Sequence, residues 1–549
     1  MLSTMQETPL LISRILEHGR RIHGRSTVTT WTGEAEPHRR TFAEIGDRAA
    51  QLAHALREEL GVTRESVVGT LMWNNAEHVE AYFALPSMGA ILHTLNLRLP
   101  AAQLAWIIRH AEDKVIIANG TVLPLLAPLL SQLPKVEHIV VAGAGDRSVL
   151  DGAGVRVHEY EELLAGRPTT YDWPELDERE AAALCYTSGT TGDPKGVLYS
   201  HRSVYLHSMQ VNMTQSMGLT DRDTSLVVVP QFHVNAWGLP HATFMTGVNM
   251  LMPDRFLQPA PLAEMIETER PTHAAAVPTI WQGLLAELTA KPRDVSSLGQ
   301  VTIGGSACPP ALMEAFDRLG MRVCHAWGMT ETSPLGTVAR PPATAETPEE
   351  EWRYRLTQGR FPAGVEPRLI GPGGDVLPWD GESAGELEVR GSWIAGAYYG
   401  GTGKEPVRPE DKFSPDGWLR TGDVGVISED GFLTLTDRAK DVVKSGGEWI
   451  SSVALENEIM AHPDVAEAAV IAVPDEKWGE RPLATVVLKE GATAGPAELR
   501  AFLAERVAKW QLPERWSVIE SVPKTSVGKF DKKVLRARYA EDGLDVTVL

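Results

Sequence analysis

The stretch Tyr186-Thr187-Ser188-Gly189-Thr190-Thr191-Gly192-Asp193-Pro194-Lys195-Gly196 combines small hydroxyl residues, three glycines and one lysine. Apolar runs at residues 182–185 and 197–199 flank it and predict two buried strands. A loop of this composition exposes backbone N–H groups and hydroxyls, and its glycines let an anion approach the backbone closely. The segment therefore predicts a polyphosphate-binding loop. It is not a Walker A loop, because Pro194 precedes Lys195 and Gly196 follows it.

The same segment resembles the phosphate loop of the adenylate-forming superfamily, which contains acyl-CoA synthetases, luciferases and the adenylation domains of peptide synthetases. The resemblance implies that Thr190 is also a magnesium ligand. It further implies phosphate contacts from the whole loop: Thr187, Ser188, Gly189, Thr190, Thr191, Gly192 and Lys195.

Bulk composition limits the classes of function. The 549 residues are enough for roughly two to four domains, and 43% hydrophobic content is ordinary for a globular protein. A formal net charge of -20 argues against a general nucleic-acid-binding face. Three cysteines without metal-ligand spacing suit a reducing compartment, and no apolar run is long enough to span a membrane. We therefore expect a cytoplasmic protein with no membrane span and no nucleic-acid partner.

The order of predicted elements indicates an α/β fold with layered βα units. Helical spacing at residues 43–60 and 76–89 alternates with strand-like runs at 67–73, 91–95 and 115–118. After about residue 440 the pattern changes to a compact α+β unit. We predict an N-terminal adenylation domain over residues 1–439 and a small mobile C-terminal domain over residues 440–549.

Two further segments match the superfamily and imply the adenine and magnesium sites. Gly304, Gly305 and Ser306 follow a predicted strand, and in the resembling proteins this segment walls the adenine pocket. The run at residues 325–332, HAWGMTET, resembles the family's aromatic-Gly-x-Thr-Glu motif. It implies nucleotide contacts from Ala326, Trp327, Gly328 and Thr330, and it makes Glu331 a catalytic residue and magnesium ligand. Trp327 stands where the family more often has tyrosine, so it can stack on adenine without offering a phenol.

Motifs near the predicted domain boundary imply ribose binding and a hinge. The sequence at 421–423, Thr-Gly-Asp, matches the motif whose aspartate accepts both ribose hydroxyls, here Asp423. The run at 437–441, DRAKD, matches the family's inter-domain segment. It implies that Arg438 contacts the ribose or phosphates and that Lys440 is the hinge residue.

The C-terminal segment at 523–529, PKTSVGK, is similar to the family's P-x-T-x-x-G-K motif and makes Lys529 the expected catalytic cation. The resemblance implies two half-reactions. A carboxylate attacks the α-phosphate of ATP and displaces pyrophosphate, and a thiol of coenzyme A then releases AMP. Rotation of the small domain between them would exchange Lys529 for a thiol channel containing Lys444, Gly446, Gly447, Glu448 and Trp449.

The segment PQFHVNAWGLP at 230–240 bears on which carboxylic acid the protein binds. We expect His233 and Trp237 to share one helix face, since they are four residues apart at an apparent helix start. In the resembling medium- and long-chain fatty acyl-CoA synthetases, the matching histidine borders the carboxylate and acts at the catalytic centre. The matching tryptophan gates the acyl tunnel. No acidic residue for an amino-acid ammonium lies nearby in the sequence.

We therefore predict an ATP-dependent acyl-CoA synthetase for a fatty or other apolar acid, using ATP, Mg²⁺ and coenzyme A, and we expect a homodimer by resemblance. Alternatives are a ligase for an aryl or short substituted acid, and an acyl-AMP ligase that loads a carrier protein. A luciferase-like oxygenase and a non-catalytic ATP-binding protein are further alternatives, and intact Glu331, Asp423 and Lys529 argue against the non-catalytic one.

Overall fold

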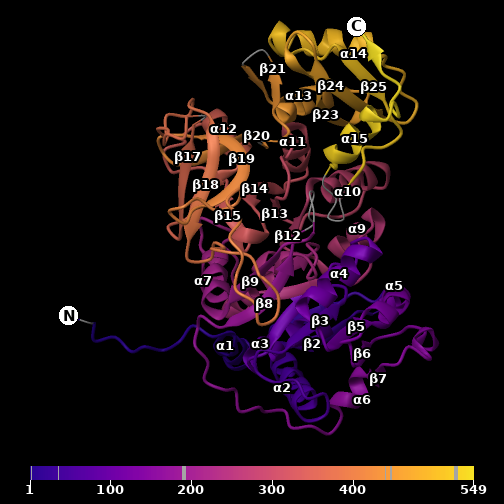
Figure 1. Cartoon of the computed structure of the whole chain (residues 1–549), viewed down its shortest axis with the longest axis vertical. Helices are drawn as coiled ribbons and strands as arrows, with labels where there is room; N and C mark the ends of the chain where they lie inside the picture. The colour runs from indigo at the N-terminus through magenta and orange to yellow at the C-terminus, as the bar shows by residue number, and fades with distance from the viewer. Residues whose placement is uncertain are drawn as a thin grey trace.

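The computed structural model describes residues 1, 3–34, 36–187, 193–371, 373–438, 440–445, 448–524 and 530–549, without the side chains of Lys444, Glu448 and Trp449. Figure 1 shows a large body formed by the N-terminal part of the chain, with a smaller C-terminal unit against one end of it. Within the described residues, none of the helices combines the length and the apolar character needed to cross a membrane.

The first sheet contains the strands that flank the predicted phosphate loop. It has seven strands among the described residues, in the order β7-β6-β5-β3-β4-β8-β9, and only the β8–β9 pair is antiparallel. The strands are β3 (Val67–Leu71), β4 (Ile91–Thr94), β5 (Val115–Asn119), β6 (His138–Ala142), β7 (Arg156–Glu159), β8 (Ala181–Tyr186) and β9 (Gly196–Ser200).

The second sheet is larger and changes character along its length. Its described strands are arranged as β17-β18-β19-β20-β16-β15-β14-β13-β12-β10-β11-β1-β2. The parallel part contains β1 (Thr27–Thr30), β10 (Thr224–Val227), β11 (Asn249–Met252), β12 (His273–Ala276), β13 (Gln300–Ile303) and β14 (Arg322–Gly328), with β2 (His38–Thr41) antiparallel at its edge. The antiparallel part contains β15 (Leu335–Val338), β16 (Gly359–Arg360), β17 (Val365–Ile370), β18 (Gly385–Gly391), β19 (Leu419–Ile427) and β20 (Phe432–Arg438).

Helices α1, α2, α3, α7 and α8 pack on one another and share one hydrophobic core with strands of both sheets. Local sequence explains where two of them begin, since Thr41 caps α2 and Ser200 caps α7. The helices of the large body are α1 (Ile12–Ile22), α2 (Phe42–Glu58), α3 (Ala76–Ser87), α4 (Ala101–Ala111), α5 (Leu123–Leu126), α6 (Tyr160–Leu164), α7 (His201–Asn212), α8 (Leu239–Thr246), α9 (Pro259–Glu269), α10 (Pro278–Ala290), α11 (Pro310–Arg318) and α12 (Pro348–Leu356).

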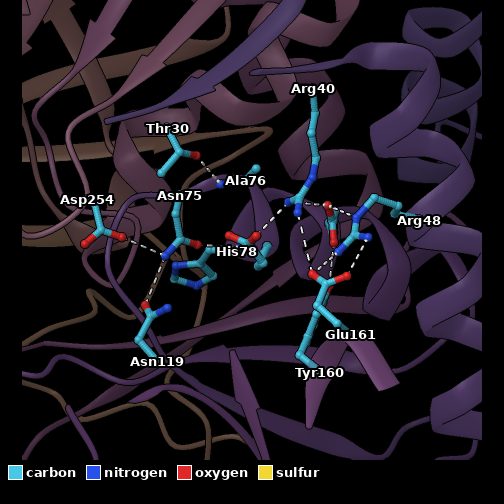
Figure 2. Close-up of polar contacts among 12 residues, drawn as sticks. Thr30, Arg40, Arg48, Asn75, Ala76, His78, Asn119, Tyr160, Glu161 and Asp254 are labelled. Atoms are coloured by element: carbon cyan, nitrogen blue, oxygen red, sulfur yellow. Dashed lines mark hydrogen bonds and ion pairs between the residues drawn. The ribbon is translucent and has the colours of Figure 1, made fainter. Parts of the chain in front are cut away.

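A buried polar junction ties the two sheets together at the start of α3 (Figure 2). The Asn75 amide donates to Asn119, just at the end of β5, and to Asp254, which follows β11, at 3.0 and 3.1 Å. The backbone N–H of Ala76 donates to the Thr30 hydroxyl of β1 at 3.0 Å. One helix N-terminus therefore fixes the carboxyl ends of strands from both sheets relative to each other.

The C-terminal unit has its own sheet and core. Its strands are β21 (Val443–Ser445), β22 (Glu448–Ile450), β23 (Val465–Asp475), β24 (Gly479–Leu488), β25 (Arg515–Val518) and β26 (Thr547–Val548). Helices α13 (Ser452–Met460), α14 (Pro496–Ala504) and α15 (Lys532–Ala540) accompany them. The predicted α/β body with a small α+β unit is confirmed, while the boundary between residues 439 and 440 stays a prediction.

Candidate active site

A cavity of about 640 Å³ lies where the parallel strands of the large sheet end. Segments that follow β10, β12 and β13 line it, together with the end of β14. In open α/β sheets ligands bind at the carboxyl ends of strands, so this is the expected place for a site. Most described residues predicted for the site line it: Thr187, Lys195, His233, Trp237, Gly304, Gly305, Ser306, Ala326, Trp327, Gly328, Thr330, Glu331, Asp423, Arg438 and Lys440.

Close backbone packing forms the wall at the end of β13. A Cβ on Gly304 would lie 3.1 Å from the Ala326 carbonyl oxygen and 3.2 Å from the Trp237 ring. Gly305 has a φ of 86°, which a residue with a side chain rarely adopts. The two glycines therefore create a flat wall beside β14, where a planar ring can lie against the backbone.

A tryptophan and a carboxylate from distant parts of the chain meet at this wall. The indole N–H of Trp327 donates to Asp423 Oδ2 at 2.8 Å, and both residues are buried. Arg438 reaches the other oxygen, with Nε 3.5 Å from Asp423 Oδ1. The resemblance left open what replaces the family's phenol; here the indole N–H supplies a donor to the predicted ribose-binding carboxylate.

The predicted magnesium ligand is a buried carboxylate with a fixed orientation. Glu331 is 5% exposed, and the Tyr398 hydroxyl donates to its Oε1 at 2.6 Å. Burial and the nearby Glu331 charge raise the pKa of Tyr398, so the phenol stays a donor. Lys195 lies over the Tyr398 ring, with Nζ 5.1 Å from its centre. Glu331 and Lys195 thus meet across one tyrosine.

The ends of the predicted phosphate loop are joined by hydrogen bonds. Thr187 N donates to the Lys195 carbonyl at 2.9 Å, and Lys195 N donates to the Thr187 hydroxyl at 3.2 Å. Eight predicted site residues lie outside the described residues: Ser188, Gly189, Thr190, Thr191, Gly192, Gly446, Gly447 and Lys529.

His233 and Trp237 both line the cavity, but the expectation that they share a helix face is wrong. Residues 234–237 have positive φ values of 46 to 56°, and Gly238 follows at 78°. The segment is a left-handed turn, and helix α8 begins only at Leu239. Such a turn costs roughly 1–2 kcal/mol per non-glycine residue, so tertiary contacts must stabilise it.

Buried contacts hold this turn in place. Asn235 Oδ1 accepts from the Tyr82 hydroxyl and from Cys185 Sγ, both at 3.3 Å. A Cβ on Gly238 would lie 2.6 Å from the His207 ring, so the close approach requires glycine. The same histidine accepts the Leu335 N–H at 3.2 Å, and burial lowers the pKa of His207 to about 3. His207 is therefore a neutral acceptor that joins the turn to β15.

Residues of the C-terminal unit complete the cavity. Phe530, Lys532, Lys533 and Arg536 line it, and they directly follow the segment that contains Lys529. Burial, with Arg438 nearby, lowers the pKa of Lys440 at the predicted hinge. Of the predicted thiol-channel residues that the structure describes, Lys444 lies on β21 and Glu448 and Trp449 lie on β22. Strand β21 also pairs with β24. Figure 1 shows β21 near the outer end of the small unit and α15 on the side toward the large body.

Sequence reasoning missed Tyr398 and Asn235. Tyr398 lies in an irregular segment after β18, and nothing in its neighbourhood distinguishes it from an ordinary buried aromatic residue. Asn235 lies between the two acid-site residues, and an asparagine in an apolar run was the one available signal. Asparagine tolerates the left-handed conformation better than most residues.

Comparison with known proteins agrees with this geometry. Residues 17–399 match the family model of the AMP-binding enzyme, and residues 454–529 match that of the AMP-binding enzyme C-terminal domain. The chain is 44% identical to a 3-methylmercaptopropionyl-CoA ligase of Ruegeria pomeroyi, over 98% of this chain and 99% of the relative. It is 42% identical to a medium-chain-fatty-acid–CoA ligase of Ectopseudomonas oleovorans, over 98% of each chain.

A solved structure of an anthranilate CoA ligase in complex with anthranoyl-AMP superposes on the chain with a TM-score of 0.86, at 26% identity and over 98% and 99% of the two chains. The suspected superfamily is thus confirmed on both domains and on the fold. Within it, the two relatives named above are ligases that join a carboxylic acid to coenzyme A. The chain belongs to the AMP-binding enzyme family and is an AMP-forming acyl-CoA ligase.

Proposed function

We propose that this ligase activates a medium-chain apolar carboxylic acid. The observation that carries the proposal is one continuous cavity with two unlike parts. The wall at Gly304 and the Trp327–Asp423 pair form the polar part. Apolar side chains form the other, namely Val211, Met217, Val228, Val234, Trp237, Leu335 and Val338. Such a lining favours a hydrocarbon chain over a charged or zwitterionic acid.

The length of strand β13 gives an estimate of the depth of the apolar part of the cavity, which we call the acid compartment. Gly304 follows its carboxyl end, whereas Gln300 at its amino end donates to the Met217 carbonyl at 3.0 Å. Strand rise of about 3.3 Å per residue separates these ends by roughly 10 Å. With C–C bonds of about 1.5 Å, an extended chain advances roughly 1.3 Å per carbon, so about eight carbons fill this length.

The floor of the compartment is held by polar contacts. Arg340 donates to the carbonyls of Ser216 and Met217 at 2.8 and 2.9 Å, and it also bonds the Gln300 side chain. Met217 itself is 5% exposed and lines the cavity. Because this backbone is pinned from two sides, we propose that Met217 ends the acyl pocket.

The residues that we assign to adenylation act by position and charge. His233 borders the acid carboxylate, Asp423 and Arg438 hold the ribose, and Lys195 with Lys529 would face the phosphates. The carboxylate oxygen attacks the α-phosphorus, the bond to pyrophosphate breaks, and negative charge grows on the phosphate oxygens. Preorganised cations in a buried site stabilise that charge and contribute most of the rate. The cavity-lining position of Phe530 and Lys532 supports an arrangement suited to this first half-reaction.

Glu331 fits a magnesium ion, which prefers oxygen ligands. Its carboxylate is buried at the cavity wall, and Tyr398 orients it through Oε1. We propose that Glu331 and Thr190 would hold Mg²⁺, which when bound offsets phosphate charge. In the second half-reaction the thiol of coenzyme A attacks the acyl carbonyl and AMP leaves. We assign Lys444, Gly446, Gly447, Glu448 and Trp449 to that thiol channel, with Lys440 as the hinge.

The short substituted acid is the second candidate, since the relative from Ruegeria pomeroyi is named for 3-methylmercaptopropionate. That acid is much shorter than roughly 10 Å. The two candidates differ in one measurable way, because a short-acid enzyme would lose rate as the chain grows beyond about five atoms, whereas a pocket of eight carbons would gain it.

The half-reactions test the proposal separately. With ATP, Mg²⁺ and octanoate but no coenzyme A, we expect pyrophosphate and enzyme-bound octanoyl-AMP by mass spectrometry. Glu331→Ala should abolish most of this product, while Glu346→Ala, at an exposed position, should leave it unchanged. Formation of ADP in place of AMP, or equal product from both variants, would contradict the assignment.

A further inference from the structure

The Trp327 indole does more than present an aromatic face. Its N–H is a single donor with no acceptor capacity, and its partner is Asp423 Oδ2 at 2.8 Å. The two residues are 96 positions apart, on β14 and β19. Trp327 is 7% exposed and Asp423 8% exposed, so water does not compete freely for this bond.

Gly336 makes room for the indole. The β14–β15 register shifts between Trp327 and Gly328, which pair with Thr337 and Leu335, so Gly336 is the extra residue of a bulge. A Cβ on Gly336 would lie 2.2 Å from Cζ3 of Trp327. The ring therefore lies directly against backbone, and Phe361 meets it edge-on at 6.3 Å between ring centres. These contacts restrict the orientation of the Trp327 ring and therefore the direction of its N–H.

The carboxylate has few other constraints. Asp423 Oδ1 faces Arg438 at 3.5 Å, but the Arg438 side chain is 47% exposed and is a long, flexible partner. The Asp423 backbone N–H donates to the Thr421 hydroxyl at 3.1 Å, which fixes the main chain and leaves the side chain free to turn. The buried indole is thus the rigid partner of this carboxylate.

We propose that Trp327 is a positioning residue for ribose recognition: its N–H sets the plane of the Asp423 carboxylate so that both oxygens can accept ribose hydroxyls. The inference rests on the nucleotide site proposed above. A carboxylate that turns away from this plane keeps the contact to the 3′-hydroxyl and loses the contact to the 2′-hydroxyl. Removal of the N–H therefore weakens the preference for ribose over 2′-deoxyribose, in addition to any loss of stacking on adenine.

Binding of two nucleotides separates positioning from stacking. ATP and 2′-deoxyATP share the base, so weaker stacking lowers both affinities by the same factor. We expect Trp327→Phe to reduce the ratio of the two affinities about tenfold, the usual scale for a hydrogen bond to a charged group. Calorimetry on the full-length protein measures the ratio without any need for turnover.

Two variants serve as controls. Trp393→Phe removes another buried indole donor, which bonds the Leu335 carbonyl at 2.9 Å, and it should leave the ratio unchanged. In an Asp423→Ala background, Trp327→Phe should have no further effect on the ratio, because the two residues act as one unit.

The inference is overturned if Trp327→Phe weakens both nucleotides equally and the ratio stays within twofold of the wild type. It is also overturned if the ratio falls as much in the Asp423→Ala background. Failure of the proposed function is distinguishable from these results, because the wild-type protein would then bind ATP with its ribose preference and form no acyl-AMP.

Discussion

Glu80 and Asp423 are both buried carboxylates paired with arginine, yet they differ in what remains for a ligand. Glu80 is 0% exposed, and both of its oxygens are taken: Arg40 and Arg48 donate to Oε1 at 3.1 and 2.7 Å, and the Tyr160 hydroxyl donates to Oε2 at 2.6 Å. Figure 2 labels Arg40, Arg48 and Tyr160 of this cluster. It also labels Glu161, which accepts from Arg48 at 2.7 Å and has a side chain that is 62% exposed. Among the described residues that line the cavity, none belongs to this cluster, so we assign the cluster a structural role.

Asp423 instead keeps accepting capacity and lines the cavity. One rigid indole donor orients it, and its arginine partner is farther away and half exposed. In this molecule, the number of donors around a buried carboxylate therefore distinguishes a structural charge from a functional one. A fully satisfied network supports stability, whereas a carboxylate held by few donors at a cavity wall is available to a ligand.

The largest effect is expected where the satisfied network is broken. Glu80→Ala removes the fully buried carboxylate that the partly buried Arg40 and Arg48 share, and it leaves the buried Tyr160 hydroxyl without its acceptor. The loss should lower the free energy of unfolding by about 3–5 kcal/mol. Urea unfolding measures this. Glu161→Ala removes a partner whose side chain is 62% exposed and should lose less than about 1 kcal/mol. If the folded Glu80 variant changed its KM for ATP by more than a few-fold, the result would contradict a purely structural role for Glu80.

Lys529, to which we assign a role in catalysis, should show the opposite pattern: a large effect on rate and a small effect on stability. Lys529→Ala should slow adenylation by about 10²–10³-fold, the scale of losing one preorganised donor, with little change in stability. Thioester formation from supplied acyl-adenylate should be nearly spared. Rapid-quench assays of the two half-reactions provide the measurement, with Lys524→Ala as the control on the same segment. Equal loss in both half-reactions would remove Lys529 from its assigned role.

His273 belongs to a second network in which every polar group has a partner, and this network can be tested through the pH dependence of stability. Its ring nitrogens bond the hydroxyls of Ser225 and Thr302, both at 2.9 Å, and burial lowers its pKa to about 4. Because the folded pKa lies below the ordinary 6.5, stability is present above pH 6.5 and is lost as the pH falls toward 4. The maximal slope is about 1.4 kcal/mol per pH unit.

Replacing the titrating ring should therefore make the unfolding free energy depend less steeply on pH in the acid range. His273→Gln keeps polar groups and cannot gain the proton, so its unfolding free energy should fall less steeply between pH 6.5 and 4. His38→Gln, at an exposed position, should show the wild-type slope. If the unfolding free energy of all three proteins fell with the same slope between pH 6.5 and 4, the buried ring would not be the group that controls acid stability.

The smallest effect concerns the floor of the acid compartment. Met217→Ala should move the preferred acid two to three carbons longer, because each methylene that gains burial contributes about 0.8 kcal/mol. The ratio of kcat/KM for decanoate over octanoate measures the shift. Met213→Ala, at an exposed position beyond α7, is the matched control. An unchanged ratio in the Met217 variant would place the end of the pocket elsewhere.

Local patterns predicted most of the fold. The expected helix at 43–60 is α2 (Phe42–Glu58), and the strand-like run at 115–118 is β5 (Val115–Asn119). Most of the described residues that the sequence motifs named also line the cavity. Hydrophobic periodicity and residue order carry this information, since both act over short stretches of chain.

What the sequence could not supply depends on contacts between distant residues. The left-handed turn before α8 looked like a helix start, and it is held by Tyr82 and Cys185 from other elements. The Trp327–Asp423 bond joins two motifs that lie 96 residues apart, and neither motif alone indicates the other. Tyr398 orients Glu331 from a segment with no distinguishing pattern. In each case tertiary structure decides the role of the side chain.

The decisive assay measures release of AMP and pyrophosphate with carboxylic acids of two to about eighteen carbons, with and without coenzyme A. We predict AMP release that requires coenzyme A and peaks near eight carbons, as expected for a compartment roughly 10 Å deep. Pyrophosphate release on which coenzyme A has no effect would contradict the proposed thiol acceptor. A peak at short substituted acids, with no rate at eight carbons, would contradict the proposed substrate.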